Sequence, residues 1–162
     1  MTIQQESLLE SEDTQHGRYL TFLLGEEVFG IEIRYVTEII GMHQITRLPE
    51  LPEHIRGIIN LRGKIIPVID MRLRFKKEPI EYNDRTCIIV IDIDDISVGL
   101  IVDEVDEVIT YEDDDIVPPP DCKTGVQNRF IEGIGRKEEN VTLILDCRRL
   151  LAEEDADDKN VL

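Results

Sequence analysis

The sequence predicts an all-β protein made of two small barrels, and three observations carry this prediction. Of its 162 residues, 41 % are apolar but only 5 % are aromatic, and Trp is absent, so branched aliphatic side chains must fill the core. Such side chains favour strands, because their stiff rotamers fit a pleated sheet. The apolar residues also come in short runs separated by turn residues, and the whole pattern occurs twice.

The repeat relates residues 18–80 to residues 81–151. A shift of 69 places Arg18–Pro49 on Cys87–Pro118. The identities are Gly30 with Gly99, Val36 with Val105, Glu38 with Glu107, Ile40 with Ile109 and Pro49 with Pro118. Beyond them the second copy has seven extra residues, and a shift of 76 places Ile55–Ile58 on Ile131–Ile134. We interpret the pattern as a duplication; the alternative is two strand-rich halves that are alike only in composition.

Each copy is predicted to begin with a hairpin followed by a third strand. Gly25-Glu26 and Asp94-Asp95 are turn signals between alternating segments. The predicted hairpins are Tyr19–Leu24 with Glu27–Ile33 and Thr86–Ile93 with Ile96–Val102, and the third strands are Val36–Ile40 and Val105–Ile109.

A second hairpin and a short helical segment are predicted to complete each copy. The hairpins are Gly57–Leu61 with Lys64–Asp70 and Gly133–Gly135 with Val141–Asp146, and the helical turns are Met71–Phe75 and Cys147–Leu151. Five short strands in about 60 residues predict a small closed barrel, which leaves no exposed strand edge. One barrel for each copy is expected, with exchange of strands between the barrels as the open alternative.

The remaining segments are predicted to be loops and tails. Pro49 and Pro52 bracket one exposed loop, and Pro118–Pro120 lies in its counterpart. Residues 1–17 and 152–162 are expected to be mobile acidic tails. Two barrels of this size are marginal alone, so we expect them to bury a shared apolar layer and to leave a groove between them.

Charge and composition disfavour several classes of partner. The net charge is −17, with ten basic and eight acidic residues over 18–80 but seven basic and eighteen acidic over 81–150. Nucleic acid and anionic membrane bind basic faces, so neither is expected as a partner. The charge either keeps the chain soluble or lets the acidic second half orient a basic partner.

We expect a cytoplasmic location and no insertion into the membrane. No segment approaches the roughly 18 apolar residues that span a bilayer, and the N-terminus does not resemble a signal peptide. The three cysteines have no CxxC spacing and are interpreted as reduced thiols.

Catalytic and metal-binding patterns are not found in the sequence. His16, His43 and His54 have no partner at a recognisable spacing, and no nucleophile or phosphate-loop motif occurs. Asp92-Ile93-Asp94 begins like a calcium loop, but Ile96 stands where an oxygen ligand belongs. We therefore expect no enzyme activity, no cofactor and no metal. The open alternatives are a small-molecule-binding double barrel that uses the groove and a metal-dependent enzyme.

The segment Gly57–Asp70, GIINLRGKIIPVID, strongly resembles the signature of the CheW-like family, and Phe29–Ile33, Val36–Ile40 and Val98–Val105 also resemble it. The resemblance covers residues 18–151. It implies two five-stranded SH3-like barrels in a pseudo-twofold arrangement. It also implies a non-enzymatic chemotaxis adaptor that couples methyl-accepting chemoreceptors to the histidine kinase CheA in membrane-associated arrays. The chain has no room for a kinase or receiver domain, so a stand-alone adaptor is expected.

The resemblance implies two partner-binding sites. The first would bind the tip of the receptors' cytoplasmic helical hairpin, and the residues predicted for it are Ile33, Val36, Glu38, Arg62, Val102 and Val105. The four apolar residues occupy equivalent places in the two copies and could line a groove for an amphipathic helix. Alternatively, they are barrel core. Arg62 could pair with a partner carboxylate or with Glu38, or be an ordinary surface charge.

The second site would bind the regulatory domain of CheA. The residues predicted for it are Met42, His43, Thr46, Arg47, Arg56, Gly57 and Gly63. Gly57 has no side chain, so another backbone could approach closely there. The alternative is a glycine required by the corner of the barrel itself.

Overall fold

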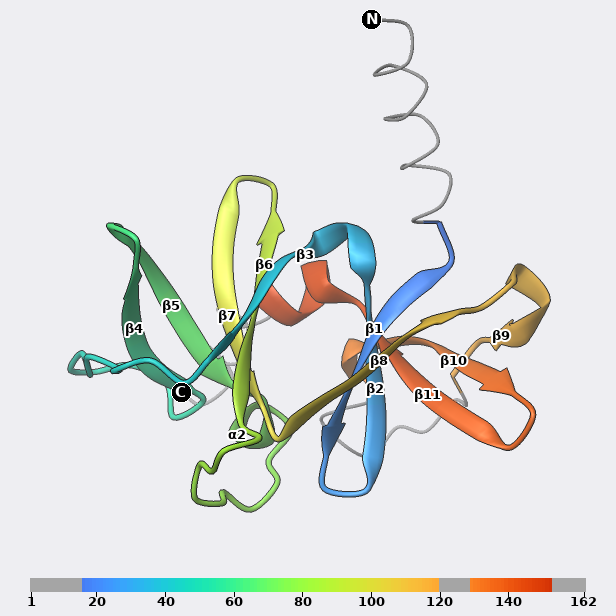
Figure 1. Cartoon of the computed structure of the whole chain (residues 1–162), viewed down its shortest axis with the longest axis horizontal. Coiled ribbons are helices and arrows are strands. Elements are labelled where there is room, and N and C mark those ends of the chain that lie inside the picture. Colours follow the sequence, from blue (N-terminus) through green and yellow to red (C-terminus); the bar gives the residue numbers. More distant parts are fainter. Residues whose placement is uncertain (1–15, 120–128, 153–162) are drawn as a thin grey trace, which may run out of the picture.

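A computed structural model describes residues 16–119 and 129–152 of the chain (Figure 1). The predicted tails 1–17 and 152–162 lie, except for residues 16, 17 and 152, outside the described residues. So do Pro120, Cys122 and most of the extra residues of the second copy.

The elements follow the predicted order, with bounds that differ by a few residues from the predicted ones. The strands of the first copy are β1 (Arg18–Leu24), β2 (Glu27–Glu32), β3 (Val36–Gly41), β4 (Ile55–Leu61) and β5 (Lys64–Asp70). Those of the second are β6 (Cys87–Ile93), β7 (Ile96–Val102), β8 (Glu104–Thr110), β9 (Ile116–Val117), β10 (Ile131–Lys137) and β11 (Asn140–Leu145). The short helices are η1 (Ile33–Tyr35), α2 (Met71–Arg74), η2 (Asp113–Asp115) and residues 147–152.

The strands form two sheets, which lie on either side of the centre in Figure 1. One has six strands in the order β8-β1-β2-β11-β10-β9, and the other has five in the order β3-β6-β7-β5-β4. The all-β prediction and the two SH3-like barrels with short helical segments are confirmed. We call them the six-stranded and the five-stranded barrel.

The barrels do not coincide with residues 18–80 and 81–151, because strands are exchanged between them, which is the open alternative to one barrel for each copy. Each barrel takes strands from both copies, because β3 pairs with β6 and β8 pairs with β1. The chain therefore crosses between the barrels twice, at η1 between β2 and β3 and at Asp103 between β7 and β8. In Figure 1, β3 and β8 run across the middle of the molecule.

The exchanged strands obey the pseudo-twofold relation that the repeat predicts. Phe22 pairs with Val105, and the residues 69 positions away from each, Ile91 and Val36, form the other pair. The parallel contacts match as well. Ile144 of β11 lies opposite Gly30, as Val68 of β5 lies opposite Gly99.

One apolar core joins the two barrels. It contains Phe22 and Phe29 from the six-stranded barrel together with Ile89 and Ile91 from the five-stranded barrel. Aromatic rings continue through it from Phe22 to Phe29, then Phe75, then Phe130, with centroid separations of 5.6, 5.1 and 6.0 Å. The predicted shared apolar layer is therefore present.

Each barrel also has its own smaller interior, and the two interiors differ in chemistry. The five-stranded barrel is filled by aliphatic side chains such as Ile59, Val68 and Ile88. The six-stranded barrel has a cluster of Tyr19, Tyr111 and Ile144, and the Tyr111 hydroxyl lies 2.8 Å from the Thr142 hydroxyl.

A shared core predicts that both barrels unfold in one transition. Phe29→Ala should lower the free energy of unfolding by about 3–5 kcal/mol, because this side chain is fully buried between two stacked rings. Urea unfolding followed by circular dichroism and by tyrosine fluorescence measures this. Ile65→Ala is the control, since Ile65 is 56 % exposed. Two separate transitions, only one of them shifted by Phe29→Ala, would contradict a shared core.

Candidate interaction site

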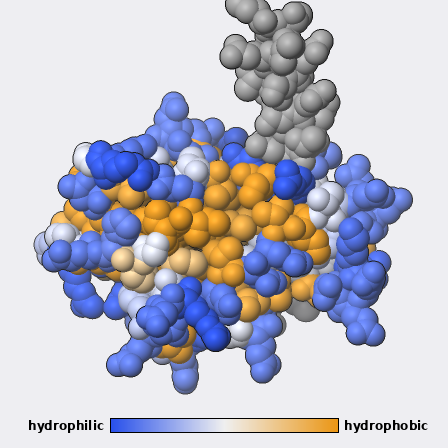
Figure 2. All heavy atoms as spheres, in the orientation of Figure 1, coloured by the Kyte–Doolittle hydropathy of each residue, from blue (hydrophilic) through white to orange (hydrophobic). Residues whose placement is uncertain are grey.

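An apolar band crosses the face of the molecule on which β3 and β8 lie (Figure 2). These strands are the outer strands of their two sheets. Ile39 on β3 and Val108 on β8 are 45 % and 43 % exposed, and they are equivalent residues of the two copies. The pseudo-twofold arrangement thus presents an apolar side chain from each copy on one face.

The four apolar residues predicted for receptor binding differ in how deeply they are buried. Ile33, Val36 and Val105 are half-buried at the margin of the shared core, so part of each side chain faces solvent. Val102 is only 1 % exposed and lies inside that core. Its side chain therefore packs the interior, as the barrel-core alternative states, and offers no contact to a partner. Val102 is the last residue of β7, whereas its counterpart Ile33 begins the turn η1, so the two equivalent positions lie in different local structures.

Glu38 and Arg62 form an ion pair, in which the Arg62 Nη2 donates to Glu38 Oε2. Glu38 lies on β3, and Arg62 lies in the tight turn between β4 and β5, where its φ of 54° is left-handed. The pair therefore ties the outer strand β3 to a hairpin tip 24 residues further along the chain. The Arg62 side chain remains 70 % exposed, so most of its donors face solvent.

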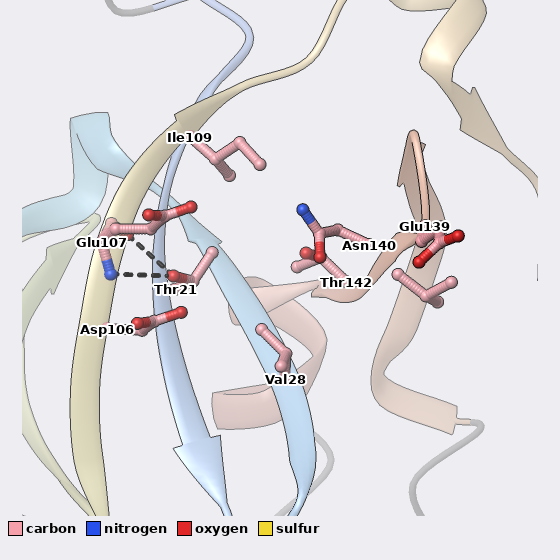
Figure 3. Close-up of a pocket in the computed structure, with 9 residues that line it drawn as sticks. Thr21, Val28, Asp106, Glu107, Ile109, Glu139, Asn140 and Thr142 are labelled. Atoms are coloured by element: carbon pink, nitrogen blue, oxygen red, sulfur yellow. Dashed lines mark hydrogen bonds between the residues drawn. The ribbon is translucent and has the colours of Figure 1, made fainter.

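The second copy has no such pair. The counterparts of Glu38 and Arg62 are Glu107 and Glu138, two acids, and Glu138 has a similar φ of 57°. A hollow of about 370 Å³ lies beside Glu107 (Figure 3). The residues lining it are Thr21, Val28, Asp106, Glu107, Ile109, Glu139, Asn140, Val141 and Thr142. It is a cavity of the six-stranded barrel, not of the predicted groove between the barrels.

The residues predicted for kinase binding gather mainly on one edge of the five-stranded barrel. Thr46 and Ile58 exchange backbone hydrogen bonds of 2.8 and 2.9 Å, which joins the loop after β3 to β4. Gly57 has a φ of +147°, and a Cβ there would lie 2.2 Å from the Thr46 carbonyl oxygen. Gly57 is thus required by the barrel itself, the alternative stated for it above.

The other kinase-site residues differ in exposure. Arg47 and His43 are exposed, and Met42 packs against the interior of the five-stranded barrel. Arg56 is half-buried at the start of β4. Gly63 is not part of this group, because it lies beside Arg62 in the β4–β5 turn, where its N–H donates to Asn60 Oδ1 at 2.8 Å.

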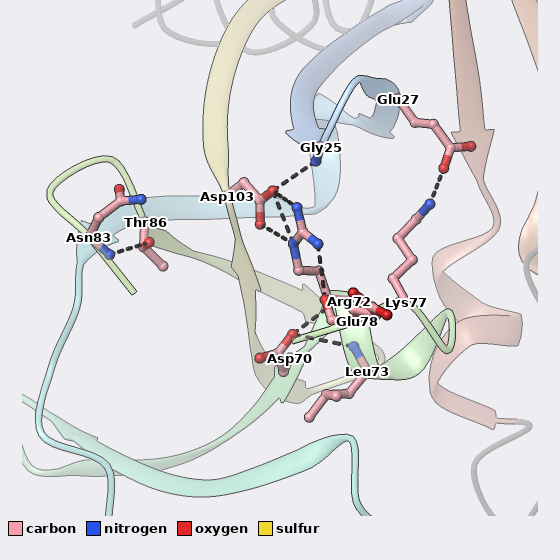
Figure 4. Close-up of polar contacts among 10 residues, drawn as sticks. All are labelled: Gly25, Glu27, Asp70, Arg72, Leu73, Lys77, Glu78, Asn83, Thr86 and Asp103. Carbon is pink, nitrogen blue, oxygen red and sulfur yellow. Dashed lines mark hydrogen bonds and ion pairs between the residues drawn. The ribbon is translucent and has the colours of Figure 1, made fainter. Parts of the chain in front are cut away.

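A partly buried polar network around Arg72 and Asp103 had no signal in the sequence (Figure 4). Arg72, in α2, donates from Nε to Asp103 Oδ1 at 2.8 Å and from Nη2 to Asp103 Oδ2 at 2.6 Å. The backbone N–H of Gly25 donates to the same carboxylate at 2.7 Å. Burial acts to raise the pKa of Asp103, but the hydrogen bonds from Arg72 and Gly25 outweigh it and hold the pKa below its ordinary value.

Within residues 16–119 and 129–152, no three His, Cys, Asp or Glu side chains are grouped so that they could hold a metal ion. The acids that begin like a calcium loop have protein partners instead: Asp92 accepts from the Ser97 hydroxyl at 3.0 Å and Asp94 pairs with Arg148 at 2.5 Å. In the same described ranges, no helix is long and apolar enough to cross a membrane.

These observations define a double-barrel interaction scaffold. Its distinguishing features are the apolar band on β3 and β8, the apolar core shared by the two barrels, and the Arg72–Asp103 contact between the two copies. The CheW-like domain model matches residues 18–155, and the chain belongs to this family. It is 34 % identical to the chemotaxis protein CheW of Klebsiella aerogenes over 143 residues, 88 % of this chain and 86 % of the relative. It is also 34 % identical to that of Bacillus subtilis, over 85 % of this chain and 88 % of the relative.

The fold agrees with a solved structure of the same family. The scaffolding protein TtCheW from Thermoanaerobacter tengcongensis superimposes with a TM-score of 0.75 and 41 % sequence identity. The match covers 80 % of this chain and 88 % of that one. The chain is thus a chemotaxis scaffold, and its partners are considered below.

Gly57→Ala should destabilise the loop that precedes β4, because both the positive φ and the 2.2 Å approach to Thr46 exclude a side chain. We expect faster amide exchange at Thr46 and Ile58, whose N–H groups form the bridge, measured by NMR. Gly63→Ala is the matched control, since a Cβ there meets nothing within 4 Å although its φ is also positive. Equal effects of the two substitutions at Thr46 and Ile58 would contradict this account.

The lowered pKa of Asp103 predicts that the free energy of unfolding decreases in acid. Its pKa is lower in the folded than in the unfolded chain, so its contribution is complete above the unfolded value near 3.9 and is lost as the pH falls through the folded value. Chemical denaturation from pH 6 to pH 2.5 checks this. Asp103→Asn should be less stable at pH 6 and show a shallower acid loss than the wild type. Parallel pH profiles would contradict the prediction.

Proposed function

We propose that this scaffold couples chemoreceptors to the histidine kinase CheA by binding each through a different surface. The names of its relatives and its solved neighbour support a role in chemotaxis. The observation that carries the coupling proposal is the apolar band on β3 and β8, together with the exposed Arg62 that pairs with Glu38 of β3.

The band is the proposed receptor surface. An amphipathic helix binds by placing its apolar face against an apolar strip. Ile39, Val108 and the exposed parts of Val36 and Val105 supply that strip. Arg62 would add specificity, because its remaining N–H groups can donate to a partner carboxylate in a bidentate geometry while Glu38 orients its guanidinium.

The loop after β3 and the start of β4 are the proposed kinase surface. Thr46 and Gly57 give this edge a rigid backbone, and Arg47 and Arg56 supply positive charge. In this proposal the two surfaces are separate: the kinase surface begins where the loop leaves β3 at Gly41, whereas Ile39 and Val108 of the apolar band lie within β3 and β8. In this proposal the chain works without catalysis in the cytoplasm and is recruited to receptor arrays at the membrane.

Arg62→Gln and Glu38→Gln should each weaken binding of a purified receptor cytoplasmic fragment by about tenfold, measured by isothermal titration calorimetry. Both variants should melt cooperatively within a few degrees of the wild type, because an exposed ion pair contributes at most about 1 kcal/mol. Arg136→Gln, an exposed arginine on β10, is the control.

Two results would contradict the proposal. Wild-type protein that fails to bind receptor fragments would remove the receptor partner. Variants that lose cooperative melting together with binding would give Glu38 and Arg62 a structural role only.

The hollow of the six-stranded barrel favours a second candidate, binding of a small polar molecule. Its wall is mostly polar and carries the carboxylates Asp106, Glu107 and Glu139, so a cationic compound would suit it. A metabolite that raises the melting temperature, with receptor fragments giving no shift, would favour this candidate over the adaptor.

A further inference from the structure

We propose that Arg72 is a positioning residue for receptor binding: through Asp103 it fixes the point, just before β8, at which the chain leaves the five-stranded barrel and enters the six-stranded one. The proposal rests on the receptor surface described above. Arg72 itself lies in α2 and is not part of the apolar band.

Asp103 is the residue between β7 and β8, so its placement sets the direction of β8. Its carboxylate accepts from Arg72 and from the Gly25 N–H in the β1–β2 turn. Its own N–H donates to the Leu23 carbonyl at 3.2 Å. Val105 follows two residues later. The carboxylate therefore joins the first hairpin, α2 and the start of β8 at one point.

Arg72 is suited to this position by its planar fork. Nε and Nη2 hold the two oxygens of Asp103, and Nη1 donates to the Glu78 carbonyl at 3.0 Å. A lysine ammonium is a point charge on a flexible stem and cannot hold both oxygens in a fixed plane. The backbone N–H of Arg72 donates to Asp70 Oδ1 at 2.9 Å, which anchors the arginine at the end of β5.

The other crossing between the barrels is held differently. The counterparts of Gly25 and Arg72 there are Asp94 and Arg148, which pair at 2.5 Å. Their side chains are 64 % and 58 % exposed, whereas those of Asp103 and Arg72 are 19 % and 16 % exposed. An exposed pair is screened by solvent and a sheltered one much less. The β8 half of the apolar band is therefore held more rigidly than the β3 half.

The variant Arg72→Met tests the positioning role of Arg72. The control is Arg136→Met, which removes an exposed arginine of β10. We expect Arg72→Met to weaken receptor-fragment binding about tenfold while affinity for the CheA regulatory domain stays within twofold. Binding is measured by calorimetry at a temperature where each variant is fully folded. Arg72→Lys should not restore receptor affinity. Hydrogen exchange should become faster at Gly25 and along residues 104–110 in Arg72→Met but not in Arg136→Met.

Equal losses of affinity for both partners would overturn the proposal, because that is what general destabilisation produces. An unchanged receptor affinity, or full recovery in Arg72→Lys, would also overturn it. If wild-type protein bound no receptor fragment, the proposed function would fail, and with it the receptor role of Arg72. In that case the clamp on β8 is still tested by exchange alone: unchanged exchange at Gly25 and residues 104–110 would refute it.

Discussion

The apolar layer between the two barrels is the contact on which the rest of the structure depends. Phe22 and Phe29 on one side meet Ile89 and Ile91 on the other, so neither barrel has a complete core without its partner. Strand exchange strengthens this dependence, since β3 and β8 each pair with a strand of the other copy. The same exchange brings β3 and β8 across the middle of one face, where their outward side chains form the apolar band. The proposed receptor surface is thus a consequence of how the core is shared.

Much of this fold could be predicted from the sequence, because hairpins and strand order follow from local patterns. The 69-residue shift predicted the equivalence of Val36 with Val105, and both residues lie in matching register. Which barrel each strand joins could not be predicted, since apolar periodicity shows which side chains are buried but not against which neighbour. Val102 shows the same limit: its equivalence to Ile33 is real, yet one is in the core and the other is at its margin. The Arg72–Asp103 contact had no local signal, because the two residues lie 31 positions apart in different copies.

The duplicated barrels have diverged in their polar contacts more than in their cores. Arg62 holds Glu38 in one copy, whereas the equivalent positions of the other copy are two acids, Glu138 and Glu107, and Glu107 lines a polar hollow. A sheltered arginine clamps one crossing, whereas an exposed pair lies at the other. The near-neutral first copy and the acidic second copy therefore differ in the polar contacts that equivalent residues make, as well as in net charge. A scaffold with two unlike ends can bind two unlike partners.

The central claim is that one rigid double barrel binds two partners at once, and formation of a ternary complex tests it most directly. The affinity for the CheA regulatory domain would be measured by calorimetry with the protein free and with it saturated by receptor cytoplasmic fragment. Separate surfaces predict the same dissociation constant within about threefold, and a three-component species in sedimentation velocity. Mutually exclusive binding, in which saturation with one partner abolishes binding of the other, would contradict it.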